Sequence, residues 1–327
     1  MVGHVLQQAG HERIMQVVYS FHMPMLFILS GYFISNKKSF REFAVSRAVR
    51  LLIPYIKCCV ILIIGKSLIA ALLGKDIVFT LTKWLYISFY GSGNGQGTWG
   101  FDNSGSWHKV FNEEIGMMWF LLALCFGSLI VKWFCGKKYA ICGILFCSLV
   151  GIFSSKVINL PFSFQNGLGV TFWIFLGVWL KQKNLICMVK QINNQHIFLC
   201  ILLWGGSILF GETQLFRNYY GLGIFDILGA LGATVSIFLF AEWLGKRRKN
   251  TIICRILQWA GYNTMMIYCL HFVTWNLFIT SILRRFVHGS LATVLACIAV
   301  TGMCMLGTYY LERFSSKFCC IKCRKGY

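Results

Sequence analysis

The sequence predicts a polytopic bundle of transmembrane α-helices. Three observations support this: long apolar runs, few charged residues, and basic residues gathered on one side of the predicted membrane. Of 327 residues, 57% are hydrophobic and 13% are charged, with a mean hydropathy of +0.67. Soluble domains carry about 25% charged residues. Backbone in lipid spans only as helices or closed barrels, and runs without strand alternation favour helices.

Nine segments approach the roughly 20 apolar residues that a span requires. Six of them contain no Asp, Glu, Lys or Arg: residues 14–36, 139–155, 157–180, 191–211, 256–283 and 286–311. The other three are residues 51–74, which include Lys57 and Lys66, the short segment 115–131, and 218–241, which include Asp226. We therefore expect about nine helices in one membrane domain covering residues 1–327.

The basic residues predict the orientation of the bundle. With the Lys37-Lys38 loop inside, 21 basic residues fall on the inner side and nine on the outer side, and Lys57 lies within a span. This bias follows the positive-inside rule and predicts a multi-pass protein of the cytoplasmic membrane with a basic cytosolic tail at 313–327. The net charge of +21 then reflects topology and contact with membrane lipids, so no nucleic-acid partner is expected.

The longest connection is predicted at residues 75–114, on the extracytoplasmic side. Glycine, serine and asparagine crowd residues 91–107, which favours a loop. Three tryptophans lie next to or within this stretch: Trp84, Trp99 and Trp107. They form either an aromatic belt at the membrane interface or stacking partners for a sugar, and we favour the belt. The 15 cysteines lie mostly in apolar runs, so reduced thiols and no metal site are expected.

The start of the chain is unusual for this topology. Nine helices with a cytosolic C-terminus place Met1 outside, and residues 1–15 do not resemble a signal peptide. Two explanations stay open. The N-terminus inserts outward unaided, or one preceding helix is missing and residues 2–4 are its last turn; we favour the second.

Two groups of residues carry potential chemistry. Arg47, Arg50 and Pro54 have helical spacing and should share one face. The arginines would either anchor the inner end of a helix or bind a phosphate, and their spacing favours neither interpretation over the other. His22 and His271 lie within apolar spans, and a neutral histidine there either bridges helices or moves protons.

Several segments together resemble the integral-membrane acyltransferase 3 family, most closely its fucose 4-O-acetylase-related branch. The resemblance lies in FHMPMLFILSGYF at 21–33, RAVRLLIPY at 47–55 and MWFLLAL at 118–124. It continues in residues 172–181, with FLG at its centre, and in GYNT at 261–264 followed by IYCLH at 267–271. The family has ten helices, the first ending in Gly-His, which Gly3-His4 matches; the resemblance thus implies an N-terminal truncation.

The resemblance implies an O-acetyltransferase that uses acetyl-CoA as donor, without a metal, and a hydroxyl of an envelope or exopolysaccharide sugar as acceptor. It implies that His4 is the base and that Arg47 and Arg50 hold the donor phosphates. His22 would assist catalysis. Acceptor contacts would come from Glu113, Glu114, Trp119 and His271. Two alternatives stay open: a transporter or flippase with His22, Asp226 and His271 along its path, and an inactive truncated relative.

Overall fold

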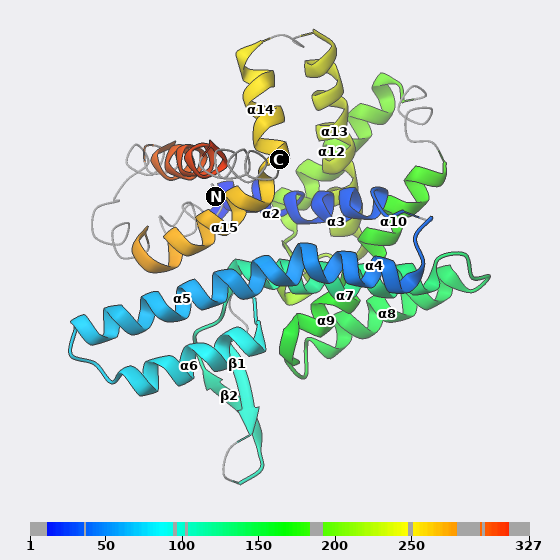
Figure 1. Ribbon diagram of the computed structural model, residues 1–327. Coiled ribbons are helices and arrows are strands. Elements are labelled where there is room, and N and C mark those ends of the chain that lie inside the picture. The colour runs from blue at the N-terminus through cyan, green and yellow to red at the C-terminus, as the bar shows by residue number, and fades with distance from the viewer. Residues whose placement is uncertain are drawn as a thin grey trace, which may run out of the picture. The chain divides into compact units, whose positions relative to one another are not determined.

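The computed structural model describes residues 12–35, 37–93, 97–101, 104–183, 192–247, 251–279, 295 and 298–313. They divide into two compact units. One comprises Gln16–Ala241, and the other comprises the remaining described residues at both ends of the chain. Each unit is mostly helical (Figure 1). The predicted all-helical membrane class is therefore confirmed, with the exception of two small hairpins.

Among the described residues, three helical stretches are long and apolar enough to cross a membrane: Phe40–Leu72, Gly116–Phe134 and Ile224–Arg247. Three shorter apolar helices are α6 (Ile77–Tyr90), α8 (Ala140–Ser154) and α12 (Asn194–Phe210). The first stretch joins α4 (Phe40–Arg47), the π-turn η1 (Ala48–Leu52) and α5 (Ile53–Leu72). The other two contain α7 (Trp119–Phe134), preceded by the 3₁₀ turn Gly116–Met118, and α13 (Ile224–Arg247).

Three predicted spans are broken, which corrects the prediction of nine continuous helices. Residues 14–36 form α2 (Glu12–Tyr19) and α3 (His22–Tyr32). Residues 157–180 form the 3₁₀ turn Pro161–Ser163, α9 (Phe164–Gly169) and α10 (Thr171–Gln182). The predicted span at residues 256–283 begins within α14 (Ile252–Tyr262) and continues as α15 (Thr264–Thr274) and the π-turn Trp275–Ile279. The predicted span at residues 286–311 lies partly outside the described residues, and residues 298–313 are helical.

Proline explains the first break. Pro24 has no N–H to donate to the carbonyl of Ser20, and its ring excludes that carbonyl from helical geometry. The chain turns at Ser20 and Phe21, and regular bonding resumes where the Met25 N–H donates to the Phe21 carbonyl at 2.9 Å. Pro24 thus lies in the first turn of α3, where proline is tolerated.

The predicted loop at 75–114 has more structure than its composition indicates. It contains α6, which packs antiparallel to α5, and a hairpin of β1 (Thr98–Phe101) and β2 (Trp107–Phe111) (Figure 1). The expectation of a loop holds only for the described residues between these elements. A second small hairpin pairs β3 (Thr213–Gln214) with β4 (Tyr219–Tyr220) across the 3₁₀ turn Leu215–Arg217.

Buried amides hold the second broken span. The Gln165 side chain accepts from the Leu160 N–H at 2.6 Å and donates to Asn159 Oδ1 at 3.0 Å. Asn218 Nδ2 donates to the carbonyls of Gly151 and Gln165, both at 3.1 Å. All three amide side chains are buried; Gln165 satisfies the Leu160 N–H, which lies outside any helix, and Asn218 links a carbonyl of α8 to one of α9. The break between Leu160 and α9 is therefore a built feature of the fold.

Helices α3 and α10 approach each other closely through glycine. A Cβ atom at Gly31 would collide with the carbonyl oxygen of Ile174, and one at Gly177 would collide with the carbonyl oxygen of Ile28. Such reciprocal small residues allow backbones in a membrane to pack closely. Helix α10 is thus the partner that packs against α3 at Gly31.

We expect Gly177→Val to destabilise the protein by about 2 kcal/mol or more, because the new side chain meets backbone that has no room to move. Thermal unfolding of the protein purified in detergent measures the change. Gly205→Ala in α12 is the matched control, because no atom lies within 4 Å of the added Cβ, and its stability should hold or rise slightly. Equal melting temperatures for Gly177→Val and the wild type would contradict the tight crossing.

Candidate active site

His22 occupies the first position of α3, and its environment selects one tautomer. Its Nδ1 lies 2.8 Å from the carbonyl oxygen of Val18, one turn earlier in α2. A carbonyl can only accept, so this contact places the proton on Nδ1 and leaves the Nε2 lone pair available as an acceptor. The side chain is half-buried. In its neutral form, His22 can therefore accept a proton or a hydrogen bond at Nε2.

Neighbouring side chains hold the break beside His22. Ser20 Oγ donates to the Val17 carbonyl at 2.8 Å and accepts from the Trp204 indole N–H of α12 at 2.9 Å. The Trp204 ring also meets Phe21 edge-on, with centroids 5.7 Å apart. The Tyr19 ring lies 5.1 Å from the His22 imidazole. These contacts set the position of the imidazole from two helices.

Trp119 lies along the same wall of α3. It begins α7 and is buried, and its ring lies 6.2 Å from Phe27 of α3. A Cβ atom at Gly93 would lie 3.1 Å from the Trp119 ring, so the loop after α6 covers the indole. The structure therefore brings Trp119 next to α3, as a packed core side chain.

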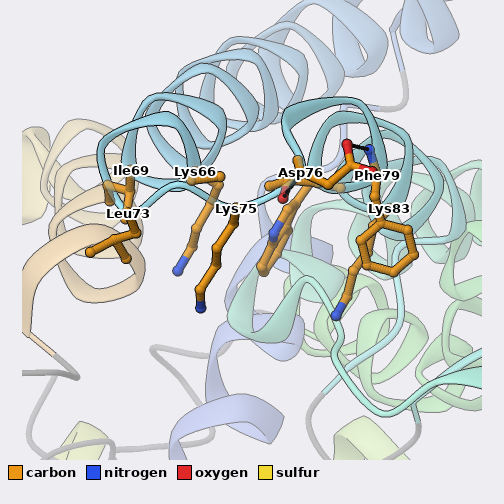
Figure 2. Close-up of a pocket in the computed structure, with 10 residues that line it drawn as sticks. Lys66, Ile69, Leu73, Lys75, Asp76, Phe79 and Lys83 are labelled. Atoms are coloured by element: carbon orange, nitrogen blue, oxygen red, sulfur yellow. Dashed lines mark hydrogen bonds between the residues drawn. The ribbon is translucent and has the colours of Figure 1, made fainter.

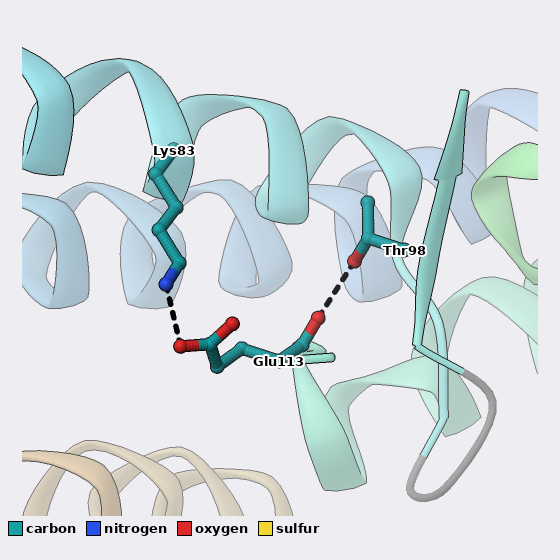
Figure 3. Close-up of polar contacts among 3 residues, drawn as sticks. All are labelled: Lys83, Thr98 and Glu113. Carbon is teal, nitrogen blue, oxygen red and sulfur yellow. Dashed lines mark hydrogen bonds and ion pairs between the residues drawn. The ribbon is translucent and has the colours of Figure 1, made fainter. Parts of the chain in front are cut away.

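Glu113 is engaged by a lysine of α6. Its carboxylate forms an ion pair with Lys83 Nζ at 2.5 Å, and its carbonyl accepts from Thr98 Oγ1 at 2.8 Å (Figure 3). Partial burial alone would raise the pKa of Glu113, but the hydrogen bond and charge of Lys83 outweigh it and hold the pKa below its usual range. The pair ties the end of the hairpin to α6. Glu114 is half-buried next to it.

We expect the ion pair to stabilise the hairpin by at most about 1 kcal/mol, because the Glu113 side chain is 50% exposed and solvent screens the charges. A lowered folded pKa means that this contribution is complete above the unfolded pKa of about 4.3 and is lost as pH falls through the folded value. Limited proteolysis of the hairpin at pH 7 and pH 3 checks this. Wild type should become more susceptible at pH 3, whereas Glu113→Gln should be susceptible at both pH values; equal protection of both proteins at pH 7 would contradict it.

Three basic side chains converge on the C-terminal end of α3. Arg47 Nη2 lies 3.4 Å from the Ser30 carbonyl, Lys132 Nζ 2.9 Å from the Ser35 carbonyl, and Lys181 Nζ 2.9 Å from the Ile34 carbonyl. A helix end leaves carbonyls without partners and carries partial negative charge, so cations are stabilised there. Arg47, Lys132, Lys181 and nearby Arg50 form what we term the basic cluster.

The basic cluster has no carboxylate counter-ion within the described part of the chain. The Arg47 guanidinium and the Lys132 ammonium both lie over the Phe43 ring, at 5.1 and 5.8 Å from its centroid. Arg50 is exposed, whereas Arg47 is half-buried. The cluster therefore keeps positive charge that an anionic ligand can neutralise.

A π-turn begins directly after Arg47 and contains Arg50, which changes the predicted geometry of the two arginines. Within η1 the Ile53 N–H donates to the Ala48 carbonyl five residues back. Pro54 follows at once, and a proline disturbs the carbonyl four residues before it, which explains the wider turn. The α-helical spacing from which we expected one shared face for Arg47, Arg50 and Pro54 therefore does not apply here.

His271 lies in the other unit, in α15. It is buried, its ring is 5.5 Å from that of Trp275, and it lines a cavity of about 330 Å³ together with Gly261, Thr264 and Tyr268. The cavity thus gathers parts of the GYNT and IYCLH segments, which sequence reasoning had grouped only by resemblance. His4 lies outside the described residues.

Asp226 has a structural environment. Its buried carboxylate accepts from Ser207 Oγ at 2.8 Å and from the N–H groups of Leu222 and Glu212 at 2.8 and 3.3 Å. These bonds join α12, the second hairpin and the start of α13. Its role is therefore to hold these elements together, and it offers little to the transport path considered from sequence.

Sequence reasoning missed most of the residues that support the site. Lys132 and Lys181 were counted only as inner-side charges, and Ser20, Trp204 and Val18 were not singled out. The amides Asn159, Gln165 and Asn166 were visible as polar residues within an apolar run, a signal that such positions are special in a membrane. No cluster of three or more His, Cys, Asp or Glu side chains occurs in the described ranges.

Comparison with known proteins identifies the class. The chain matches, over residues 1–313, the family model described as an acyltransferase domain, that of acyltransferase 3. The protein therefore belongs to the acyltransferase 3 family of polytopic membrane proteins and is an acyltransferase that uses an acyl donor. No characterised protein and no solved structure matches it significantly. The membership supports the transferase over the transporter alternative.

Proposed function

We propose that the protein transfers an acetyl group from cytosolic acetyl-CoA to a hydroxyl of an envelope or exopolysaccharide sugar, as in the fucose 4-O-acetylase-related branch, from a site in the cytoplasmic membrane. The observation that carries this proposal is the arrangement along α3. An available histidine nitrogen lies at one end of the helix, and a basic cluster without carboxylate counter-ions lies at the other. Family membership supports acyl transfer in general, and the donor and acceptor are the proposed part.

The separation of the two ends suits CoA. From His22 to Ser30 the helix rises about 12 Å, at 1.5 Å per residue. CoA carries its phosphates and its thioester at opposite ends of an extended pantetheine arm. With the phosphates at Arg47 and Arg50 on the predicted cytosolic side, the arm runs beside α3 and brings the thioester toward His22. Guanidinium groups suit this task because they bind phosphate in a bidentate manner.

The transfer step needs one base and one positioning group. His4 takes the proton of the acceptor hydroxyl as the oxygen attacks the thioester carbonyl; the C–S bond then breaks, and the leaving CoA thiolate takes that proton from His4. His22 Nε2 accepts a hydrogen bond from the acceptor or from the base. Glu113, Glu114, Trp119 and His271 are proposed on the acceptor side. With Glu113 paired to Lys83, the ion pair offers the acceptor both an oxygen and an ammonium group.

For the histidines we expect different kinetic effects. His4→Ala should lower kcat by about 100-fold or more, which is the usual contribution of a general base. His22→Asn keeps a donor near the Val18 carbonyl but removes Nε2, so the acceptor KM should rise about fivefold, the loss of one neutral hydrogen bond. Acetyl transfer from radiolabelled acetyl-CoA to a sugar acceptor measures both.

The outcomes separate the roles. Unchanged activity in His4→Ala removes that residue from the mechanism. An unchanged acceptor KM in His22→Asn removes His22 from acceptor positioning. His22→Ala serves as a control for the fold, because it also removes the bond to Val18 and should lower the melting temperature in addition.

For the arginines we expect an effect on donor binding. Arg50→Ala should raise the KM for acetyl-CoA by about tenfold with little change in kcat, because a charged hydrogen bond is lost from ground state and transition state alike. Arg50 is exposed and has no ion-pair partner among the described residues, so the fold should tolerate the change.

Arg41→Ala is the matched control, since Arg41 is an exposed arginine on α4 outside the RAVR motif. It should leave the KM unchanged. Equal KM values for Arg50→Ala and Arg41→Ala would contradict a phosphate contact at Arg50. Absence of acetyl-CoA binding by the wild-type protein would refute the proposed donor.

A further inference from the structure

A lysine-lined pocket lies between α5 and α6, away from the basic cluster. Its volume is about 310 Å³, and the end of α5, the connecting turn and the start of α6 form its walls. Lys66, Lys75 and Lys83 come from these three parts, and Figure 2 shows their side chains extending to the same side of the hairpin. None of these residues has a role in the proposed transfer reaction except Lys83, through Glu113.

Backbone hydrogen bonds hold Lys75 over the end of α5. The Lys75 N–H donates to the Ala70 carbonyl at 2.9 Å, and the Gly74 N–H donates to the Ala71 carbonyl at 3.2 Å. Gly74 has a φ of 65°, which completes a glycine-terminated helix end. Lys66 precedes the end of α5 at Leu72 by six residues, a rise of about 9 Å. Both lysines line the pocket, and Figure 2 shows their side chains extending in the same direction.

The pocket carries excess positive charge. Lys83 is neutralised by Glu113, and the Asp76 carboxylate, which caps α6 by accepting from the Phe79 N–H at 3.0 Å, leaves two lysines against one carboxylate at the pocket. Lys66 and Lys75 form no ion pair with any carboxylate of the described residues. The Lys66 ammonium lies 5.3 Å from the Trp84 ring centroid, a weak partner compared with an anion. An anionic group in the pocket would complete this arrangement.

The surface around the pocket is apolar and exposed. Leu72 is 86% exposed, Val78 72% and Leu68 61%, all on the same helical hairpin. In a membrane such side chains contact lipid tails, and lysines near the end of a span extend toward headgroups. Positive charge beside a lipid-facing surface fits a ligand that has both a phosphate and hydrocarbon chains.

We propose that the Lys66–Lys75 pocket is a binding site for the phosphate headgroup of an anionic membrane lipid. By the predicted orientation it faces the outer leaflet, opposite the Lys37-Lys38 loop. The phosphate lies between the two ammonium groups, and the acyl chains lie along the exposed apolar face of α5 and α6. This inference is independent of the acyl-transfer reaction.

The test measures binding of phosphatidylglycerol to the purified full chain by native mass spectrometry, with zwitterionic phosphatidylcholine as the reference lipid. The double variant Lys66→Gln/Lys75→Gln should bind phosphatidylglycerol at least about tenfold more weakly, because each basic residue near a membrane surface contributes to anionic lipid binding. Binding of phosphatidylcholine should not change. Lys66→Arg/Lys75→Arg should retain most of the affinity.

Lys109→Gln/Lys156→Gln is the matched control, since it removes the same charge from the same predicted side. Both lysines are exposed, and Lys156 also lies over an aromatic ring, that of Phe153 at 5.4 Å, but neither lines the pocket. The control should keep wild-type affinity. Melting temperatures in a neutral detergent should agree among all variants, which shows that the fold is intact.

Three results would overturn the proposal. Equal losses in the pocket and control variants would show a general charge effect. No loss in the pocket variant would remove Lys66 and Lys75 from the site. Competition by inorganic phosphate at the same concentration as the lipid would assign the pocket to a soluble phosphate and reject a lipid ligand.

Discussion

Hydrogen bonding of the two ends of α3 is the constraint on which the candidate site depends. The helix has 11 residues and rises about 16 Å, roughly half the hydrocarbon core. A helix end that lies within the hydrocarbon needs hydrogen-bond partners from the protein. His22 and Ser20 serve the carbonyls at the break before it, and Arg47, Lys132 and Lys181 serve the carbonyls at its other end.

The same requirement links structure to chemistry. The bond that satisfies the Val18 carbonyl also fixes the His22 tautomer, and the cations that satisfy the far end of α3 also form the basic cluster. The break before α3 positions His22, and the end of α3 positions the basic cluster. The side chains that make a broken helix tolerable in lipid are thus those on which the proposed reaction relies.

The break between Leu160 and α9 is also stabilised by side-chain hydrogen bonds, in this case from neutral groups. Between α8 and α10 the chain passes through Pro161 and two residues with positive φ, Phe162 and Ser163. Gln165 satisfies the Leu160 N–H and bonds to Asn159, and Asn218 links the carbonyls of Gly151 and Gln165 on the flanking helices. Ser163 and Tyr90 add bonds to the carbonyls of Gly91 and Asn159, which join this break to the end of α6. Amide side chains thereby hold the short α9 against α7 and α8.

Sequence patterns predicted the features of this fold that depend on local composition. Apolar length predicted segments that contain α5, α8 and α12 and that overlap α7 and α13, because a span needs a minimum run of hydrophobic residues whatever its neighbours are. Composition failed at residues 75–114, where α6 is apolar enough to pack on α5 although glycine-rich sequence follows it. The breaks at Pro24 and Pro161 were signalled by proline, but hydropathy counts the whole run and does not register them.

The sequence by itself determined the membrane class, the inner-side excess of basic residues and the motifs shared with acyltransferase 3, since each depends on residue type and order. Tertiary structure alone decided which cations meet the end of α3, which carboxylate Lys83 neutralises, and which nitrogen of His22 is available. Lys132 and Lys181 lie about 100 and 150 residues from the carbonyls that they bind. Contacts at such separations arise from helix packing, so the order of residues along one segment does not predict them.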